Sequence, residues 1–153
     1  MSRRYRVLMV SSSGGVLLDL LALRPWWSGH DVVWVAVRAP DTEIALAGRR
    51  VHWRPEVFAS TRLRLVPATW RALRLLRAER PDVIVSAGTG VAVGFFLAAR
   101  LLRVPSLWLE TLNMTGRAGV AARICTRLAA AVLVQRPALL KTRPRAVLIG
   151  ELY

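Results

Sequence analysis

This sequence predicts an α/β fold, a Rossmann-like parallel sheet flanked by helices, on three observations. Short apolar segments rich in β-branched residues alternate along the chain with segments of helical spacing. Glycine-rich turns follow two of the apolar segments, at residues 11–15 and 86–90. No internal repeat, low-complexity segment or linker divides the 153 residues, which suit a single domain, 1–153, with one core. Strands that alternate with helices form βαβ units, whose sheet is parallel and whose crossovers are right-handed.

The predicted elements follow from the position of each apolar segment and of the residues that end it. The predicted strands are 5–11, 31–37, 50–53, 82–86, 105–110 and 131–135, with 146–149 as a last candidate. The predicted helices are 17–23, 70–80, 91–102 and 117–129. Pro25 and Pro81 end the first two helices. Between residues 39 and 67, Pro40, Pro55 and Pro67 interrupt any long element, so a loop region is expected there.

Residues 83–99 carry no charge, and a membrane-spanning helix is one interpretation of them. The small and flexible residues at 86–90 weaken a helix there, so a strand, a turn and a helix are the preferred prediction. The helix at 91–102 is then apolar almost all round, and it is either buried or lies against lipid. We assign Phe95 and Phe96 to membrane contact on this basis.

The charge balance predicts an anionic partner. Lysine and arginine number 23 against 9 acidic residues, which gives a net charge of +14. Nucleic acid, an acidic membrane and a phosphorylated ligand all fit such a balance. A single cysteine, Cys125, excludes a disulfide framework and favours a reducing compartment. His30 and His52 lack metal-ligand spacing, no signal peptide is expected, and we predict neither a metal nor a cofactor.

Both glycine-rich turns stand between a strand and a helix, where ligands of open parallel sheets bind. The first contains Ser12, Ser13, Gly14 and Gly15, and the second contains Gly88, Thr89 and Gly90. Glycine lets the backbone approach a ligand, and a helix N-terminus offers free N–H groups to an anion. Binding of a diphosphate or sugar phosphate is one interpretation, and a tight turn without a ligand is the other.

A carboxylate follows the fifth predicted strand at its carboxyl end. Glu110 could act as a general base or hold sugar hydroxyls, or it could cap a helix or pair with an arginine. The polar residues Asn113, Thr115 and Arg117 follow and could add contacts to a ligand.

A basic face is predicted for the helix at 70–80. Arg71, Arg74 and Arg77 recur at intervals of three, opposite a leucine face. A basic amphipathic helix that begins at Trp70 is typical of contact with an anionic membrane surface, and a solvated crossover helix is the alternative. Trp26 and Trp27 are further candidates for the membrane interface, whereas Trp34 and Trp108 fall in strands and are assigned to the core.

Several segments together resemble one family. They are the opening strand with residues 12–15, Asp41 and Thr42, residues 81–90, Glu110 with 115–117, the stretch 134–140, and the closing positions 144–146 and 149–150. In these segments the chain resembles PssD-type bacterial exopolysaccharide proteins and the eukaryotic membrane-anchor subunit of the dolichol-pathway UDP-GlcNAc transferase. It is similar, more distantly, to the N-terminal half of MurG.

The resemblance implies the acceptor-binding, membrane-recruiting half of a GT-B glycosyltransferase, whose donor-binding half is a separate subunit. The implied reaction is inverting transfer of a sugar from a UDP-sugar to a polyprenyl-diphosphate-linked saccharide, at the cytoplasmic face of the cell membrane, with peripheral or monotopic attachment. The two glycine-rich turns would hold the diphosphate, and Glu110 would be the base or a hydroxyl ligand. The family pattern has Gly-Gly-His in the first turn, and Val16 stands at the third position here.

The alternative function is a basic nucleic-acid-binding or nucleotide-binding α/β module without transferase activity. Aromatic residues do not interleave with the arginines as a stacking platform for bases requires. We therefore expect no nucleic acid among the partners.

Overall fold

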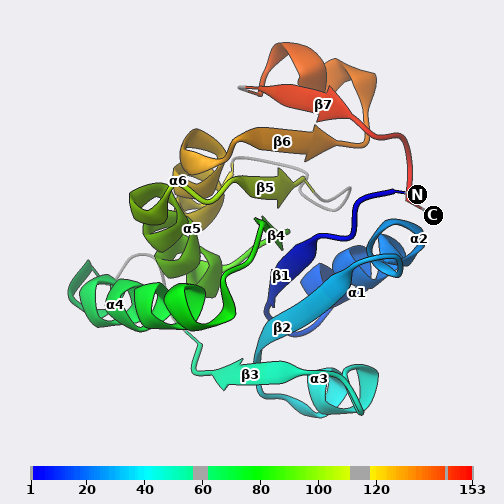
Figure 1. Cartoon of the computed structure of the whole chain (residues 1–153). Helices are drawn as coiled ribbons and strands as arrows, with labels where there is room; N and C mark the ends of the chain where they lie inside the picture. The colour runs from blue at the N-terminus through cyan, green and yellow to red at the C-terminus, as the bar shows by residue number, and fades with distance from the viewer. Residues whose placement is uncertain (1, 57–61, 111–117, 144, 153) are drawn as a thin grey trace.

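A computed structural model describes residues 2–56, 62–110, 118–143 and 145–152. Its seven strands form one parallel sheet in the order β3-β2-β1-β4-β5-β6-β7 (Figure 1). The strands are β1 (Arg6–Ser11), β2 (Asp31–Val37), β3 (Val51–Arg54), β4 (Val83–Ser86), β5 (Ser106–Leu109), β6 (Ala131–Val134) and β7 (Ala146–Leu148). The predicted parallel α/β fold is therefore confirmed, and each predicted strand is present, with bounds that differ by no more than a few residues.

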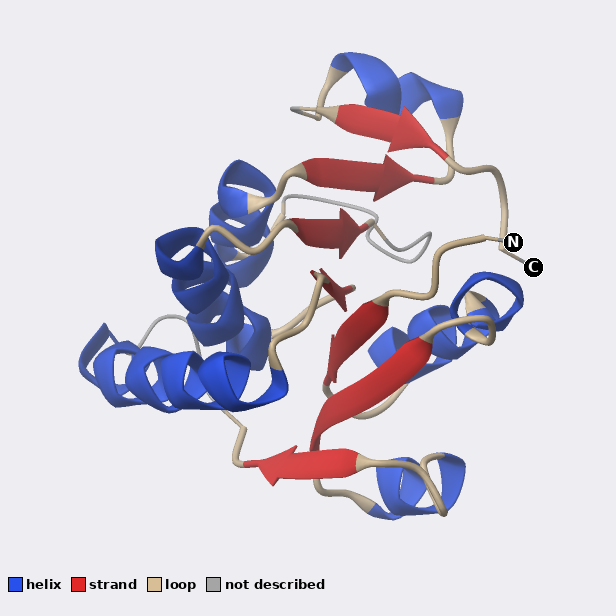
Figure 2. Ribbon diagram, in the orientation of Figure 1, coloured by secondary structure: helices blue, strands red, loops and turns tan. Residues whose placement is uncertain are grey.

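Helices cover both faces of the central strands (Figure 2). They are α1 (Gly15–Ala22), α2 (Arg24–Trp27), α3 (Pro40–Ala45), α4 (Arg62–Glu79), α5 (Gly90–Leu102) and α6 (Val120–Leu128), followed by the 3-10 helix η1 (Pro137–Lys141). Successive side chains of β1 point to opposite faces, so Leu8 and Val10 pack toward α5 while Val7 and Met9 pack toward α1. Because both faces are covered, these strands are continuously apolar instead of alternating with polar residues.

The helix α5 lies inside the domain, which corrects the assignment of two of its residues. Phe95 and Phe96 are 3% and 0% exposed, and Phe96 meets the ring of Trp108 edge-on at 5.9 Å between centroids. Gly94 lies against the backbone of α4 at Ala68, so that α4 covers this part of the helix. Phe95 and Phe96 therefore contact protein and not a membrane. Among the described residues, no helix combines the length and the apolarity that crossing a bilayer requires.

The stretch 39–67 is more regular than its prolines predict. Pro40 occupies the first turn of α3, where a helix needs no N–H from it. Pro67 lies inside α4 instead of ending it, near the start of an 18-residue helix, so only one early hydrogen bond is lost. Thr42 also orders this region, because its hydroxyl accepts a hydrogen bond from the N–H of Ala39 at 2.9 Å. The predicted loop is wrong for these two helices.

The exposure of the tryptophans shows which of them lie in the core and which lie at the surface. Trp27 is only 4% exposed, and its indole N–H donates to the carbonyl of Leu20 at 3.0 Å, so its assignment to a membrane interface is wrong. Trp34 and Trp108 lie in the core as predicted. Trp26 and Trp70 remain on the surface, at 41% and 58% exposure.

The single cysteine is expected to be chemically inert in the folded protein. Cys125 is fully buried in α6, and burial raises the pKa of its thiol well above the usual range, because the thiolate would be desolvated. Between pH 7 and pH 9 the neutral thiol therefore persists, and we expect no reaction with a thiol reagent until the domain unfolds. Labelling followed by mass spectrometry, with and without urea, measures this. Rapid labelling in native buffer at pH 8 would contradict it.

Candidate functional site

The two glycine-rich turns lie side by side at the carboxyl edge of the sheet, because β1 and β4 are hydrogen-bonded neighbours. The Ser86 hydroxyl donates to the carbonyl of Val10 at 2.7 Å and joins the ends of these strands. A Cβ atom built on Gly88 would lie 3.0 Å from Cγ2 of Val16. Val16, at the position where the resembled family has histidine, therefore packs an apolar side chain against the second turn.

The first turn has an internal partner that the sequence interpretation missed. Gly14 has φ +74°, and its N–H donates to Oδ2 of Asp41 at 2.7 Å. Asp41 belongs to the first turn of α3. In the sequence, Asp41 and Thr42 contribute to the family resemblance, which gives them no individual role. Because a carboxylate already accepts this hydrogen bond, an anionic ligand could use the Gly14 amide only by displacing Asp41. Ser12 and Ser13 bond to each other locally, the hydroxyl of Ser12 donating to the carbonyl of Ser13 at 3.3 Å.

The second turn carries backbone strain at the start of α5. Thr89 has φ +74° and ψ 173°, a conformation that β-branched residues rarely adopt and that costs about 1–3 kcal/mol. Its hydroxyl oxygen is buried and has no hydrogen-bond partner within the described part of the chain. Gly88 and Gly90 flank it and are both buried. Strain of this kind is typical of functional sites, where surrounding contacts hold the backbone in place.

Glu110 lies at the end of β5 and is 2% exposed. Its Oε1 accepts a hydrogen bond from Nη2 of Arg143 at 2.8 Å. Its Oε2 and the Nε of Arg143 are buried, and neither has a partner among the residues that the structure describes. Gln135, at the end of β6, donates to the backbone carbonyl of Glu110 at 3.2 Å. A salt bridge to an arginine, one of the alternatives for Glu110, is thus present, and the second carboxylate oxygen is buried without a partner among the described residues.

Replacing Arg143 with alanine is expected to lower the free energy of unfolding by about 2–3 kcal/mol, because the buried carboxylate of Glu110 then lacks its cation. A fully buried pair would lose more, but the Arg143 side chain is 23% exposed and water screens part of its charge. Urea unfolding followed by tryptophan fluorescence measures the change. Arg136→Ala removes the same charge from an exposed neighbouring position and is expected to change the free energy by less than about 0.5 kcal/mol. Equal effects of the two variants would contradict a specific role for the pair.

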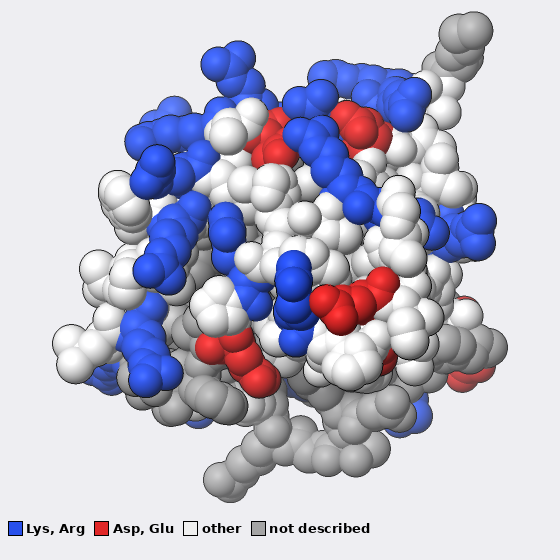
Figure 3. All heavy atoms as spheres, turned by 90° about the horizontal axis from the view of Figure 1, so that it is seen from below, with Lys and Arg blue, Asp and Glu red and all other residues white. Residues whose placement is uncertain are grey.

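The remaining candidate residues from the sequence are either exposed or lie outside the residues that the structure describes. Asn113, Thr115 and Arg117 lie outside the described residues. On α4, Trp70, Arg71, Arg74 and Arg77 are exposed as predicted. The Arg74 guanidinium lies 4.9 Å from the Trp70 ring centroid. Seen from below, Lys and Arg side chains gather over much of the surface, and acidic side chains form only small patches among them (Figure 3).

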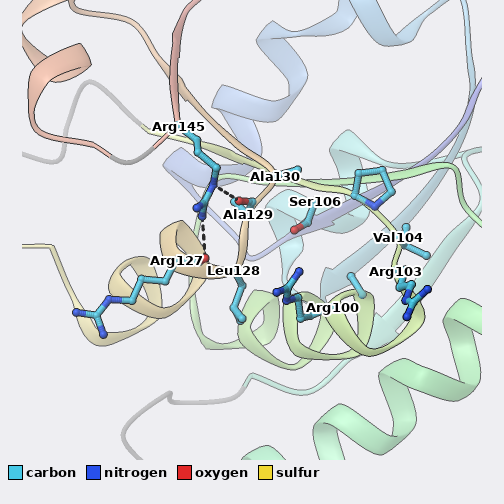
Figure 4. Close-up of a pocket in the computed structure, with 11 residues that line it drawn as sticks. Arg100, Arg103, Val104, Ser106, Arg127, Leu128, Ala129, Ala130 and Arg145 are labelled. Carbon is cyan, nitrogen blue, oxygen red and sulfur yellow. Dashed lines mark hydrogen bonds between the residues drawn. The ribbon is translucent and has the colours of Figure 1, made fainter.

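Several hollows are lined by arginine, and two of them lie at opposite ends of the strands. One, of about 180 Å³, lies at the carboxyl edge between the end of β3 and the starts of α4 and α5, and Arg71 lines it. The other, of about 400 Å³, lies at the amino edge, where Figure 4 shows Arg145 donating to the backbone carbonyls of Ala129 and Arg127 at the end of α6. Arg100 lines the same hollow from the end of α5. Within the described residues, no group of three or more His, Cys, Asp or Glu side chains could hold a metal ion.

This seven-stranded parallel sheet, flanked by helices, has the fold of the N-terminal half of a GT-B glycosyltransferase. The sequence pattern of Glycosyltransferase Family 4 matches residues 22–110, more than half of the chain, and the chain belongs to that family. The finer resemblance to PssD-type proteins stays a prediction.

Two curated relatives are UDP-N-acetylglucosamine–N-acetylmuramyl-(pentapeptide) pyrophosphoryl-undecaprenol N-acetylglucosamine transferases. The one from Nitrosospira multiformis is 29% identical over 159 residues, covering 95% of this chain and 43% of the relative. The one from Alkalilimnicola ehrlichii is 30% identical over 155 residues, covering 90% of this chain and 41% of the relative. The chain therefore spans about two-fifths of the length of these relatives.

Solved structures show the same fold. MurG from Acinetobacter baumannii superimposes with a TM-score of 0.71 at 23% identity, over 87% of this chain and 42% of that one. UDP-GlcNAc 2-epimerase from Neisseria meningitidis, bound to UDP-GlcNAc, superimposes with a TM-score of 0.71 at 13% identity, over 96% of this chain and 47% of that one. At these identities the superpositions establish the fold alone, and proteins with different chemistry share this fold.

Proposed function

We propose that this domain is the acceptor-binding component of a two-component inverting glycosyltransferase. It would act with a donor-binding component to transfer a sugar from a UDP-sugar to a polyprenyl-diphosphate-linked saccharide. The curated relatives are named as transferases of N-acetylglucosamine to a pyrophosphoryl-undecaprenol acceptor, and they are more than twice as long as this chain. The proposed donor-binding component would correspond to the part of these relatives that lies outside the match.

The observation that carries the proposal is the half-satisfied carboxylate of Glu110. Arg143 holds Oε1, so the carboxylate keeps one orientation, and Oε2 is a buried acceptor at the carboxyl edge of the sheet that has no partner among the described residues. In an inverting transfer the acceptor hydroxyl attacks the anomeric carbon of the UDP-sugar, the bond from that carbon to the diphosphate breaks so that UDP leaves, and a base removes the proton of the hydroxyl. We assign Oε2 to accept the hydrogen bond of that hydroxyl and, as the base, its proton.

The glycine-rich turns take different parts in this proposal. The second turn, with Gly88, Thr89 and Gly90, opens a 13-residue helix whose N-terminal N–H groups favour an anion. In the first turn, the bond from Gly14 to Asp41 brings a negative charge to the same place. Gly15, Ser12 and Ser13 therefore suit uncharged sugar hydroxyls better than a diphosphate, which shifts the diphosphate toward the second turn.

A reconstitution assay tests the proposal. The purified chain is incubated with a UDP-sugar and a short polyprenyl-diphosphate-linked saccharide, alone and with the product of the neighbouring reading frame that carries a UDP-sugar signature. We expect transfer only in the combined reaction, with inversion at the anomeric carbon. Full activity of the chain alone would contradict the two-component arrangement, and absence of transfer with any UDP-sugar and the partner would contradict the function.

We further propose that α4 holds the domain at the cytoplasmic face of the membrane. Its outer face exposes Leu63, Val66 and Trp70 beside Arg74 and Arg77. Arginine near an anionic bilayer strengthens binding severalfold per residue, and indole favours the headgroup level.

In a vesicle-sedimentation assay, Arg77→Ala is therefore expected to weaken binding to vesicles that contain anionic lipid about fivefold, because one arginine contact is lost. Binding to purely zwitterionic vesicles should be weak for both proteins. Arg136→Ala, at η1 and away from α4, removes the same charge and should bind like the wild type. If both variants lose the same affinity, net charge and not the α4 face drives recruitment.

A further inference from the structure

The hollow of about 180 Å³ at the carboxyl edge has a net charge, an apolar wall and a position that together favour one class of ligand. It lies at the carboxyl edge of the sheet, between the end of β3, the first turns of α4 and the first turn of α5. Arg54, Arg64 and Arg71 line it, and Glu56 is the one acidic residue in its lining. The four ionisable groups sum to +2, from three positive charges and one negative charge.

None of the three arginines forms an ion pair within the described residues. The Nε of Arg54 is buried without a hydrogen-bond partner in that part of the chain, and its Nη1 reaches only the carbonyl of Trp53 at 3.4 Å. Burying the Nε–H of a guanidinium without a hydrogen-bond partner costs free energy, and a ligand that accepts this hydrogen bond would remove the cost. Arg64 and Arg71 are exposed and are available to an anion, and the arginine fork matches the oxygens of a phosphate group.

The inner wall of the same hollow is apolar. Val91 and Phe95 contribute it from α5, and Pro67 and Ala68 from α4. Gly94 lets α4 and α5 pack closely at this wall. A Cβ atom built on Gly94 would lie 3.3 Å from the backbone of Ala68. A cationic rim over an apolar wall matches an amphiphilic anion and is a poor match for a free sugar or an inorganic ion.

The hollow also reaches the residue that follows the second glycine-rich turn. Val91, in its lining, follows Gly90 directly, so the N-terminal N–H groups of α5 lie next to the arginine rim. The first turn has Asp41 on the Gly14 amide, which repels an anion there. Both observations direct a phosphorylated group to the α5 side of the edge.

We propose that this hollow binds an isoprenoid diphosphate, with the diphosphate on Arg54, Arg64, Arg71 and the start of α5, and the first isoprene unit against Val91 and Phe95. The inference rests on the proposed function, because it places the lipid-diphosphate end of the acceptor. With the diphosphate in this position, the saccharide that it carries extends along the carboxyl edge toward Glu110.

Titration of the purified chain with farnesyl diphosphate, followed by calorimetry, tests the site without membrane or partner. Farnesol and inorganic diphosphate are the matched half-ligands, and we expect each to bind at least tenfold more weakly than farnesyl diphosphate. Arg71→Ala should raise the Kd for farnesyl diphosphate about tenfold. Arg100→Ala removes the same charge from the other end of α5, about 14 Å along the helix from Val91, and should leave the Kd unchanged. Equal losses in both variants, or equal affinity for inorganic diphosphate, would overturn the site.

The reconstituted transferase separates this inference from the function that it extends. If the complex transfers sugar, Arg71→Ala should raise the KM for the lipid-linked acceptor and leave the KM for the UDP-sugar unchanged. Transfer with an unchanged acceptor KM would overturn the site and leave the function standing. Farnesyl diphosphate binding with the expected variant pattern, but no transfer by the wild-type complex, would leave the site standing and overturn the function.

Discussion

Replacing Glu110 with glutamine is expected to reduce transfer by the two-component enzyme at least about 100-fold, which is the lower end of what a positioned base contributes. Glutamine keeps the size of the side chain and still offers a carbonyl oxygen to the guanidinium of Arg143, but it cannot accept a proton. The loss should fall on kcat, with the acceptor KM changed only slightly. Steady-state kinetics with varied acceptor concentration measures both constants.

The kinetic pattern separates a base from a ligand for hydroxyls. If Glu110 only binds a hydroxyl, Glu110→Gln raises the acceptor KM and largely preserves kcat. Glu43→Gln serves as the control, because Glu43 forms a surface ion pair with Arg38 at 3.5 Å and should show wild-type kinetics. Wild-type kinetics of Glu110→Gln itself would remove the residue from the proposed mechanism.

The largest expected effect on stability is that of Phe96→Ala, a loss of about 3–5 kcal/mol. Phe96 is fully buried between α5 and the sheet, and its ring meets that of Trp108 edge-on. Truncation removes apolar contact, leaves a cavity and deletes the aromatic pair. Since small domains are stable by about 5–15 kcal/mol, much of the folded population could be lost near 37 °C. Urea unfolding at 25 °C, followed by circular dichroism, measures the change.

Leu101→Ala on the same helix provides the comparison. Leu101 is 69% exposed, so the substitution should change the free energy of unfolding by no more than about 0.5 kcal/mol. A small effect of Phe96→Ala, similar to that of Leu101→Ala, would show that α5 is not packed as described. It would also reopen the lipid-facing interpretation of this helix.

The strands could be predicted because their information is local. In β1, β2 and β4 nearly every residue is apolar, and glycine or proline stands close to each segment. Parallel strands buried on both faces produce such runs, and the helices between them imply the parallel direction. The error between residues 39 and 67 has a local cause as well. A proline in the first turn of a helix costs little, so Pro40 marks a helix start, whereas Pro67 lies inside α4 and does not end it.

The candidate site was predicted in part. The two glycine-rich turns and Glu110 were found because position at the carboxyl end of a strand is visible in the sequence, and the sheet order brings β1, β4 and β5 together. Asp41 was missed as a partner of Gly14, since the two are 27 residues apart and only the folding of α3 against the first turn joins them. The Arg143 partner of Glu110 was not identified for the same reason, at a separation of 33 residues.

The sequence by itself determined the fold class, the position of the glycine-rich turns and Glu110 at the ends of strands, and the basic character of the surface, because these depend on local composition and on position within βαβ units. Only the tertiary structure decided which apolar side chains are covered and which charged groups meet. Phe95, Phe96 and Trp27 have the composition of an interfacial belt, yet neighbouring helices and strands bury them. Burial and ion pairing depend on distances between segments remote in sequence, and those distances are set by packing.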